Sequence, residues 1–378
     1  MRIETELAQA GSRWDERTGA VSMPVYQAAT FRHPGLGQST GFDYSRTSNP
    51  TRLVLEETMA RLDGGHRAFA FASGLAAIDC VMRLFKRGDC VVATEDLYGG
   101  SFRLFEKVYQ DHGIEIVYVD TSRADRALAV LDSTVRGIFL EVPTNPLLKI
   151  ADVKAIAGEA KKRGILTIVD NTFLTPCLMK PLKLGADLAI YSATKYLGGH
   201  NDVLGGIVVS GAPELSEKIA FLQNAVGAVL GPQDSWLLLR GLKTLSVRME
   251  RQQKNAAVLA GWLSGHPRVR KVHYPGLLWH RGRLCLRRQA SGFGAMISIE
   301  VADPSMVPGI LAGVRVFLFA ESLGGVESLI TFPAVQTHAD MAPEIRKRLG
   351  IHDRLLRLSA GIENVEDLIE DLDAALSQ

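Results

Sequence analysis

The first two thirds of the chain alternate between short apolar runs and segments whose apolar positions recur at helical spacing. Three of the runs, at 137–141, 165–169 and 188–192, contain few polar residues. Such runs are typical of parallel strands that are buried on both faces. The segment 153–163 lies between two of them and has the apolar spacing of a helix. This strand–helix–strand alternation predicts an α/β sheet with helices on both of its faces.

The same pattern continues upstream of these strands. We expect strands at 68–72, 90–93 and 114–119 and helices at 51–62 and 74–85. Because these elements extend the same alternation, we interpret residues 51–243 as one large α/β domain.

The two ends of the chain have a different pattern. Residues 1–50 are rich in Gly, Ser, Pro and Thr and have little periodicity, so we expect an extended arm and not an independent domain. In the C-terminal part we expect a helix at 235–264, a break at 273–276, a strand at 295–301 and a helix at 365–376. Residues 244–378 are therefore predicted to form a second, smaller α+β domain, since 378 residues are many for one core.

Composition and charge are those of an ordinary soluble globular protein. Apolar residues make up 47% of the chain and charged residues 22%, and the net charge is +2. This charge gives no general electrostatic reason to bind nucleic acid or an anionic membrane. Two basic clusters, at 268–271 and 281–288, lack a recognised groove-reading motif, so we interpret them as solvated faces.

Several classes of site are not indicated. The cysteines Cys80, Cys90, Cys177 and Cys285 form no C-x-x-C pair, which favours reduced thiols. The first 20 residues have no apolar signal core and no apolar run approaches a membrane span, so we expect a cytoplasmic protein. The nine histidines show no metal-ligand spacing, and we expect no metal site. The P-loop, G-x-S-x-G and H-E-x-x-H motifs are absent.

Polar residues gather at the carboxyl ends of the predicted strands, where open α/β sheets bind ligands. Asp170 ends an apolar strand, and a buried carboxylate needs a cation or several donors, although an Asp there is also a common cap. Ser73 opens a predicted helix whose first amides suit an anion, although such a serine is usually only a cap. Lys195 follows the hydroxyls of Ser192 and Thr194 in a stretch where most lysines are simply solvated.

Together these groups suit one cofactor, pyridoxal 5'-phosphate. This cofactor needs a lysine for its aldehyde, a carboxylate for its ring nitrogen and a cradle for its phosphate. Lys195, Asp170 and the hydroxyls beside Lys195 supply all three, and Tyr98 is available as an aromatic platform. The carboxylate would keep the ring nitrogen protonated, so that the ring draws electrons from the substrate.

With these residues the sequence resembles the cysteine and methionine metabolism family of pyridoxal-phosphate enzymes, the cystathionine synthases and lyases. The resemblance covers nearly the whole chain. It rests on eight blocks in the family's order, at 44–46 with 49–51, 71–77, 98–100, 141–146, 170–173, 192–199, 321–329 and 357–364. It implies the aspartate aminotransferase-like fold (fold type I), with a mostly parallel sheet in the large domain and a smaller α+β C-terminal domain.

The resemblance also implies roles around the cofactor. Lys195 would bind the aldehyde and then act as the catalytic base, and Tyr98 would stack on the ring as the second catalytic residue. Asp170 would pair with the ring nitrogen, Thr172 would lie beneath the ring, and Asn145 would contact its hydroxyl side. The phosphate would be held by Ser192, Thr194 and the amides of Gly74 and Leu75. Without the resemblance, Tyr98 is as readily a core aromatic and Asn145 part of an ordinary Asn-Pro turn.

The resemblance gives the N-terminal arm a purpose. Tyr44 and Arg46 would reach the phosphate of the neighbouring subunit and so complete its active site. The implied assembly is a homotetramer, a dimer of dimers with shared active sites. The implied partners are small amino-acid substrates, with no nucleic acid and no membrane.

A second set of residues is implied for the substrate, namely Arg357, Ser322, Asn145, Glu321, Asp43 and Arg103. Arg357 would hold the substrate carboxylate in a bidentate pair, helped by Ser322. Two carboxylates on the distal side would hold the amino group of cysteine or of the distal half of cystathionine. Taken alone, Arg357 is more often a surface or capping arginine, and a loop carboxylate in water is the lesser alternative for Glu321.

Two residues bear on the reaction. Gly100 stands where methionine γ-lyases resemble each other in having cysteine, and Glu321 is similar to the glutamate of synthases and γ-lyases. The stretches 31–43 and 336–346 look most like bacterial synthases that also use sulfide. Our first hypothesis is a cystathionine γ-synthase that joins an O-acylated homoserine, with acetyl as the expected acyl group, to cysteine. A γ-lyase is second and a β-lyase third, and a catalytically silent binding relative is the non-enzyme alternative.

Overall fold

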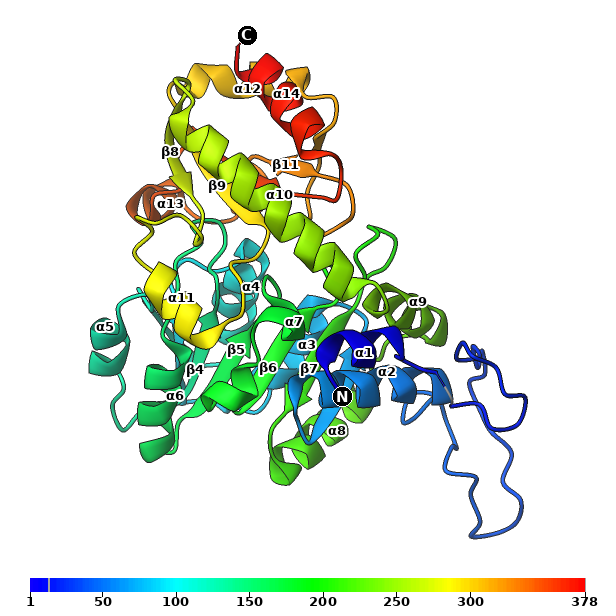
Figure 1. Cartoon of the computed structure of the whole chain (residues 1–378). Coiled ribbons are helices and arrows are strands. Elements are labelled where there is room, and N and C mark those ends of the chain that lie inside the picture. The colour runs from blue at the N-terminus through cyan, green and yellow to red at the C-terminus, as the bar shows by residue number, and fades with distance from the viewer. Residues whose placement is uncertain (13, 378) are drawn as a thin grey trace.

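The computed structural model, drawn in Figure 1, describes residues 1–12 and 14–377. Its larger sheet has seven strands in the order β1-β7-β6-β5-β4-β2-β3. The strands are β1 (Arg67–Phe71), β2 (Cys90–Thr94), β3 (Glu115–Val119), β4 (Val135–Glu141), β5 (Leu166–Asp170), β6 (Leu188–Ser192) and β7 (Gly206–Ser210). Strand β7 is antiparallel to both of its neighbours, and the pairs from β3 to β6 are parallel. The predicted mostly parallel sheet is confirmed.

Helices cover both faces of this sheet because its strands are apolar on both sides. In β6, Leu188 and Ile190 belong to the core that includes α3, whereas Ala189 and Tyr191 belong to the core that includes α2. Successive strand residues point to opposite faces, so both faces must be covered. The helices of this domain are α2 (Pro50–Asp63), α3 (Gly74–Met82), α4 (Gly99–Leu104), α5 (Ala124–Ala129), α6 (Val153–Lys162), α7 (Thr175–Leu178), α8 (Pro213–Val226) and α9 (Pro232–Leu242). A π-helical turn spans Phe105–Tyr109 and a 3₁₀ turn spans Pro181–Leu184.

The start of α2 is fixed by its sequence. The Asn49 side chain accepts hydrogen bonds from the amides of Thr51 and Arg52, and Pro50 occupies the first helical position. Both features favour a helix N-terminus. Gly64 ends the helix in the left-handed conformation (φ 75°), which a residue without Cβ adopts readily.

The smaller domain is built on a five-stranded sheet in the order β10-β11-β12-β9-β8. Its strands are β8 (Val269–His273), β9 (Met296–Val301), β10 (Leu318–Phe319), β11 (Leu329–Thr331) and β12 (Leu355–Ser359), and all pairs except β10 with β11 are antiparallel. Its helices are α10 (Leu245–Gly265), α11 (Arg283–Gln289), α12 (Val307–Gly313), α13 (Pro343–Leu349) and α14 (Val365–Leu376), with a 3₁₀ turn at Pro304–Met306. Helix α10 runs from the larger domain along the smaller one (Figure 1). Tyr191, Leu259 and Ile297 lie in one continuous core, which joins the two domains.

Several local predictions differ from the structure. The expected helix at 235–264 is two helices, α9 and α10, which are separated at Lys243 and Thr244. The arm contains a short helix, α1 (Ile3–Ala8), whose Leu7 is buried against the core. Strand β7 was not predicted, although its sequence is apolar, because no helix separates it from β6.

Candidate active site

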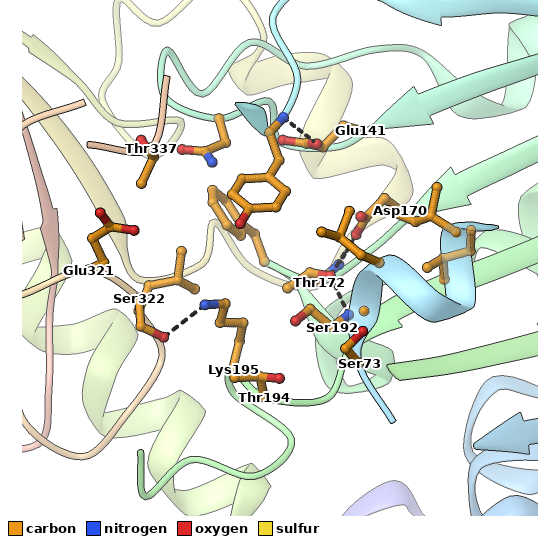
Figure 2. Close-up of a pocket in the computed structure, with 18 of the residues that line it drawn as sticks. Ser73, Glu141, Asp170, Thr172, Ser192, Thr194, Lys195, Glu321, Ser322 and Thr337 are labelled. Atoms are coloured by element: carbon orange, nitrogen blue, oxygen red, sulfur yellow. Dashed lines mark hydrogen bonds between the residues drawn. The ribbon is translucent and has the colours of Figure 1, made fainter. Parts of the chain in front are cut away.

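A cavity of about 330 Å³ lies at the carboxyl ends of β4, β5 and β6, where the two domains meet. Its lining comprises Ser73, Gly74, Leu75, Ile78, Tyr98, Glu141, Pro143, Asn145, Asp170, Thr172, Phe173, Ile190, Ser192, Thr194, Lys195, Leu204, Glu321, Ser322, Leu323, Thr337 and Arg357. Strand ends of an open parallel sheet are the usual ligand position. Twelve of the sixteen residues predicted for the site line this one cavity. The labelled residues in Figure 2 surround a common space.

The ends of β5 and β6 are tied together by a short chain of hydrogen bonds. Thr172 donates to one oxygen of Asp170 from its amide at 3.0 Å and from its hydroxyl at 2.6 Å. The same hydroxyl accepts the amide of Ser192 at 2.8 Å (Figure 2). Burial raises the pKa of Asp170, and the bonds from Thr172 oppose that effect. The Asp170 carboxylate is thus oriented by Thr172, which is itself bonded to the end of β6, before any ligand binds.

Glu141 is a residue of the cavity to which the sequence analysis assigned no role. It ends β4 directly beside Asp170 in the parallel register, is buried, and accepts the amide of Tyr98 at 2.9 Å. Burial, and next the charge of Asp170, raise the pKa of Glu141 well above its usual range. The signal was available, because Glu141 ends an apolar run just as Asp170 does.

The first turn of α3 offers an anion cradle. The side chain of Ser73 caps the helix by accepting the amide of Ala76 at 3.1 Å, which leaves the amides of Gly74 and Leu75 directed out of the helix start. A Cβ on Gly74 would lie 3.0 Å from Oγ of Ser192 and would fill the space between α3 and β6. Glycine therefore keeps this space open for a phosphate-sized anion.

Lys195 lies three residues beyond β6, and its side chain reaches across the cavity. It contacts the small-domain wall, which is formed by the lining residues Glu321, Ser322, Leu323, Thr337 and Arg357. Its Nζ donates to the hydroxyl of Ser322 at 2.8 Å (Figure 2). Burial, together with the positive charge of Arg357, lowers the pKa of Lys195 to about 8, and the carboxylate of Glu321 opposes this effect. An amine with this pKa has an appreciable neutral fraction near physiological pH, and this fraction can act as a nucleophile or a base.

Arg357 extends from the middle of β12 and is 2% exposed. Its guanidinium donates to the side-chain oxygen of Asn145 at 2.9 Å, the carbonyl of Ser322 at 2.9 Å and the hydroxyl of Thr331 at 3.2 Å. Its Nε is buried with no hydrogen-bond partner in the described part of the chain. Burial lowers the pKa of Arg357 to about 10, so it remains a cation at neutral pH with a donor left for an anion.

The backbone of Tyr98 is fixed by hydrogen bonds, and its ring lines the cavity. Its amide bonds to Glu141, and the carbonyl of the preceding Leu97 accepts Nε2 of His338 at 3.3 Å. A Cβ on Gly100 would overlap the Tyr98 ring, so glycine is what lets the ring take this position. His338, a second omitted residue, also bonds through Nε2 to the carbonyl of Asn145 at 3.0 Å.

Four predicted site residues lie outside this cavity. Asp43 accepts the hydroxyl of Ser39 at 2.7 Å within the arm, and Arg103 forms an exposed ion pair with Asp340 at 2.7 Å. Tyr44 is 47% exposed on the arm. The guanidinium of Arg46 lies 5.5 Å from the centre of the Tyr44 ring, and Arg46 donates to the carbonyl of Asn224 at 2.6 Å. Within one chain the structure does not bring these four residues to the cavity, and their roles remain predictions.

The cavity fits pyridoxal phosphate on three observations. Two buried carboxylates, Glu141 and Asp170, lie side by side, and among the described residues no basic side chain pairs with either, so the place suits a cationic ring nitrogen. The amides of Gly74 and Leu75 provide a phosphate cradle. The amine of Lys195 bonds to Ser322 (Figure 2), and Lys195 lines the same cavity as this cradle. The fold and site are thus those of a pyridoxal-phosphate-dependent enzyme.

Comparison with known proteins agrees. The model of the family described as Cys/Met metabolism PLP-dependent enzyme matches residues 4–377, and the chain belongs to this family. It is 50% identical over 376 residues to cystathionine gamma-lyase of Bacillus subtilis (100% of this chain, 99% of the relative). It is 49% identical over 376 residues to cystathionine beta-lyase of Lactococcus lactis subsp. cremoris (100% and 99%). Among solved structures, cystathionine gamma synthase from Xanthomonas oryzae pv. oryzae in complex with cystathionine superposes with a TM-score of 0.98 at 43% identity (100% and 98%).

These relatives establish the class of chemistry and leave the particular reaction open. The protein is a pyridoxal-phosphate enzyme of trans-sulfuration in cysteine and methionine metabolism, as the sequence predicted. Relatives that are 50%, 49% and 48% identical to the chain are named for three different activities, so identity alone does not choose among them. Among the described residues, no helix is long and apolar enough to cross a membrane, and no group of three or more His, Cys, Asp or Glu is arranged for a metal ion.

Proposed function

We propose that this enzyme is a cystathionine γ-synthase that condenses O-acetyl-L-homoserine with L-cysteine. In this replacement the Cγ–O bond of the ester breaks, acetate leaves with the electron pair, and the cysteine sulfur forms the new Cγ–S bond and releases its proton. The observation that carries the proposal is the placement of Glu321. It is an exposed carboxylate that lines the small-domain side of the cavity, where it can receive the amino group of the incoming cysteine.

The large-domain wall would hold the cofactor. Asp170 would pair with the ring nitrogen, Tyr98 would stack on the ring, and the cradle of Gly74, Leu75 and Ser192 would hold the phosphate. When bound, pyridoxal phosphate supplies an electron-withdrawing ring that stabilises negative charge at the substrate α carbon. Glu141 would support this wall from behind, because it fixes the amide of Tyr98.

Lys195 would move the protons. In its neutral form, Nζ of Lys195 would bind the cofactor's aldehyde and, once released by the substrate amine, take the α proton of the substrate. Ser322 accepts a hydrogen bond from this nitrogen at 2.8 Å and so directs it toward the small-domain wall, from which the β carbon of a bound substrate would also be reached. One base could then serve both carbons.

Arg357 would hold the substrate α-carboxylate. Asn145, Ser322 and Thr331 fix the guanidinium plane, and its unpartnered Nε is available to the ligand. A charge-assisted bond to a buried guanidinium is stronger than a neutral hydrogen bond and orients the substrate. The α carbon would thereby be presented to Lys195.

The arm would complete the site of a second copy in a homotetramer. Among the described residues, the cationic side chains that line the cavity are those of Lys195 and Arg357, and both bond to Ser322 on the small-domain wall. In the part of the chain that the structure describes, no arginine of the large domain lines the phosphate cradle, whereas Arg46 and Tyr44 are exposed on the arm. A phosphate dianion favours such a cation, so we assign Tyr44 and Arg46 to the neighbouring subunit's phosphate.

A cystathionine γ-lyase is the second candidate, because a relative with that name is 50% identical over the whole chain. Identification of products by mass spectrometry separates the two. With O-acetyl-L-homoserine and L-cysteine supplied to the cofactor-loaded enzyme, cystathionine should accumulate, and sulfide should then be tested as an acceptor. If no cystathionine forms, while added cystathionine yields 2-oxobutyrate or pyruvate, the protein is a lyase and the proposal is wrong.

A further inference from the structure

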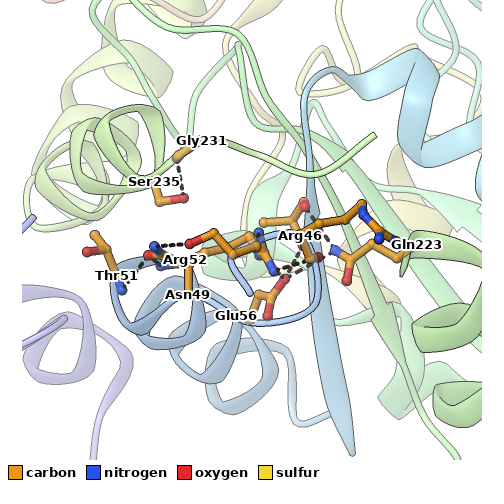
Figure 3. Close-up of polar contacts among 10 residues, drawn as sticks. Arg46, Asn49, Thr51, Arg52, Glu56, Gln223, Gly231 and Ser235 are labelled. Carbon is orange, nitrogen blue, oxygen red and sulfur yellow. Dashed lines mark hydrogen bonds and ion pairs between the residues drawn. The ribbon is translucent and has the colours of Figure 1, made fainter. Parts of the chain in front are cut away.

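A buried arginine lies at the base of the arm. Arg52 belongs to the first turn of α2, three residues beyond the helix cap, and is 2% exposed. Its guanidinium donates to the carbonyl of Ser45 at 2.7 Å and to the carbonyl of Arg46 at 3.2 Å (Figure 3). These bonds grip the backbone of the turn that carries Tyr44 and Arg46, and they leave the side chains of both residues exposed.

Arg52 is in turn anchored to the large domain. Its Nε lies 3.5 Å from a carboxylate oxygen of Glu56. The same oxygen accepts the amide of Ala70 in β1 at 2.8 Å and the side-chain amide of Gln223 in α8 at 3.3 Å (Figure 3). The arm turn is therefore connected through Arg52 and Glu56 to the sheet and to a helix that packs on it.

Asn49 holds the same turn from a second side. Its oxygen caps α2, while its side-chain nitrogen donates to the hydroxyl of Ser45 at 3.0 Å and to the carbonyl of Tyr26 at 2.9 Å. Burial of the Arg52–Glu56 pair requires both charges to lose their water, and replacing such a pair by apolar residues is often neutral or stabilising. Stability alone is thus a weak reason for a buried ion pair whose donors point at an exposed turn.

We propose that Arg52 is a positioning residue that presents Tyr44 and Arg46 to the cofactor phosphate of a second copy of the chain. This inference rests on the proposed sharing of active sites. Arg52 touches neither cofactor nor substrate. It acts by fixing the backbone between two exposed side chains, so that the arm reaches the neighbouring site with one geometry and loses little conformational entropy on docking.

The experiment compares cofactor affinity with complementation between chains. In the Arg52→Met holoenzyme, pyridoxal phosphate measured by its absorbance should dissociate about tenfold more readily, because two charge-assisted bonds to the turn are lost. Arg52→Lys keeps a cation beside Glu56 and should recover part of that affinity. Arg61→Met is the matched control, since Arg61 is an exposed arginine of the same helix and its loss should leave cofactor affinity unchanged.

Mixing variants then tests in which chain Arg52 acts. When Arg52→Met is unfolded together with Lys195→Ala and refolded, a mixed dimer has one site with an intact lysine and an intact arm. The mixture should therefore exceed the summed activities of the two variants, as should Arg46→Ala mixed with Lys195→Ala. If Arg46→Ala complements and Arg52→Met does not, sites are shared but Arg52 acts within its own chain, and the inference is overturned.

Two further outcomes are decisive. If Arg46→Ala also fails to complement Lys195→Ala, the shared site itself is absent, and the proposed assembly fails together with the inference. If Arg52→Met lowers the melting temperature but leaves cofactor affinity as in Arg61→Met, Arg52 is a structural residue only and the inference is overturned. Should Arg52→Met not fold, Arg52→Lys is carried through the same mixing experiment and decides the question in the same way.

Discussion

The two walls of the cavity are built on different principles. On the large-domain wall, Asp170 and Thr172 are bonded to each other and to the end of β6, so their positions are set by the sheet. On the small-domain wall, Glu321 is exposed, and Arg357 keeps one buried donor without a partner among the described residues. The groups of the first wall are thus oriented before any ligand binds, whereas the second wall keeps an exposed carboxylate and a free guanidinium donor for the substrate.

This difference separates what the family shares from what varies within it. A cofactor that never changes suits a wall whose groups are already oriented by a rigid sheet. Substrates that differ at their distal end suit a wall that carries an exposed loop carboxylate such as Glu321. Ser322 on this wall has φ 97°, a left-handed value that is unusual for a residue with a Cβ and costs about 1–3 kcal/mol. The hydroxyl of Ser322 accepts a hydrogen bond from Lys195, so this backbone strain lies at a contact between the two walls.

The largest effect is expected where the two walls meet. Lys195→Ala removes the amine that would bind the cofactor's aldehyde and accept the α proton, so turnover should fall by at least about 10³-fold. The measurement is product formation per enzyme under saturating cofactor and substrates. Lys183→Ala, at a solvent-facing lysine of the same domain, is the control. A Lys195→Ala enzyme that retained most of its activity would remove this residue from the chemistry.

A smaller effect is expected on the pH dependence of cofactor uptake, because a residue of the small-domain wall acts on the pKa of Lys195. Since the pKa of Lys195 is lowered to about 8, the fraction of neutral amine grows as pH rises through 8. The cofactor-free protein should therefore take up the cofactor faster above this pH than below it. The Glu321 carboxylate opposes the lowering, so Glu321→Gln should lower the pKa of Lys195 further. The midpoint of the uptake rate should then move to lower pH.

The matched control for this prediction is Glu327→Gln. Glu327 is an exposed carboxylate of the same loop that bonds to Asn201 at 2.7 Å and does not line the cavity. Its midpoint should stay at that of the unaltered protein. A midpoint that moves to higher pH in Glu321→Gln, or equally in both variants, would contradict the electrostatic link between Glu321 and Lys195.

The large-domain wall was largely predictable from the sequence, and the small-domain wall was not. Asp170, Ser192 and Lys195 follow apolar strands, and the direction of parallel strands brings such residues to one edge. Glu141 was placed at the end of the predicted strand 137–141 but was not assigned to the site, although it ends a strand just as Asp170 does. Arg357 was identified by resemblance only, because the middle of an antiparallel strand gives no signal for a buried cation.

The partners of the predicted residues also needed the structure. The contact of Lys195 with Ser322 joins residues 127 positions apart, and that of His338 with Asn145 joins residues 193 apart. Such pairs are set by how the two domains pack, which local pattern does not encode. The expected places of Asp43 and Arg103 rested on the resemblance alone, and within one chain both lie outside the cavity.

The most direct test of the division between the walls measures cofactor affinity and substrate KM side by side in Asp170→Asn and Arg357→Met. Asp170→Asn should weaken cofactor binding by about tenfold or more, because a charge-assisted bond is lost. Arg357→Met should leave cofactor affinity within about twofold and raise the KM for the amino-acid substrate by about 30-fold. If both variants instead lose cofactor to the same extent, with substrate KM unchanged in Arg357→Met, the two walls do not separate cofactor binding from substrate binding, and the account is wrong.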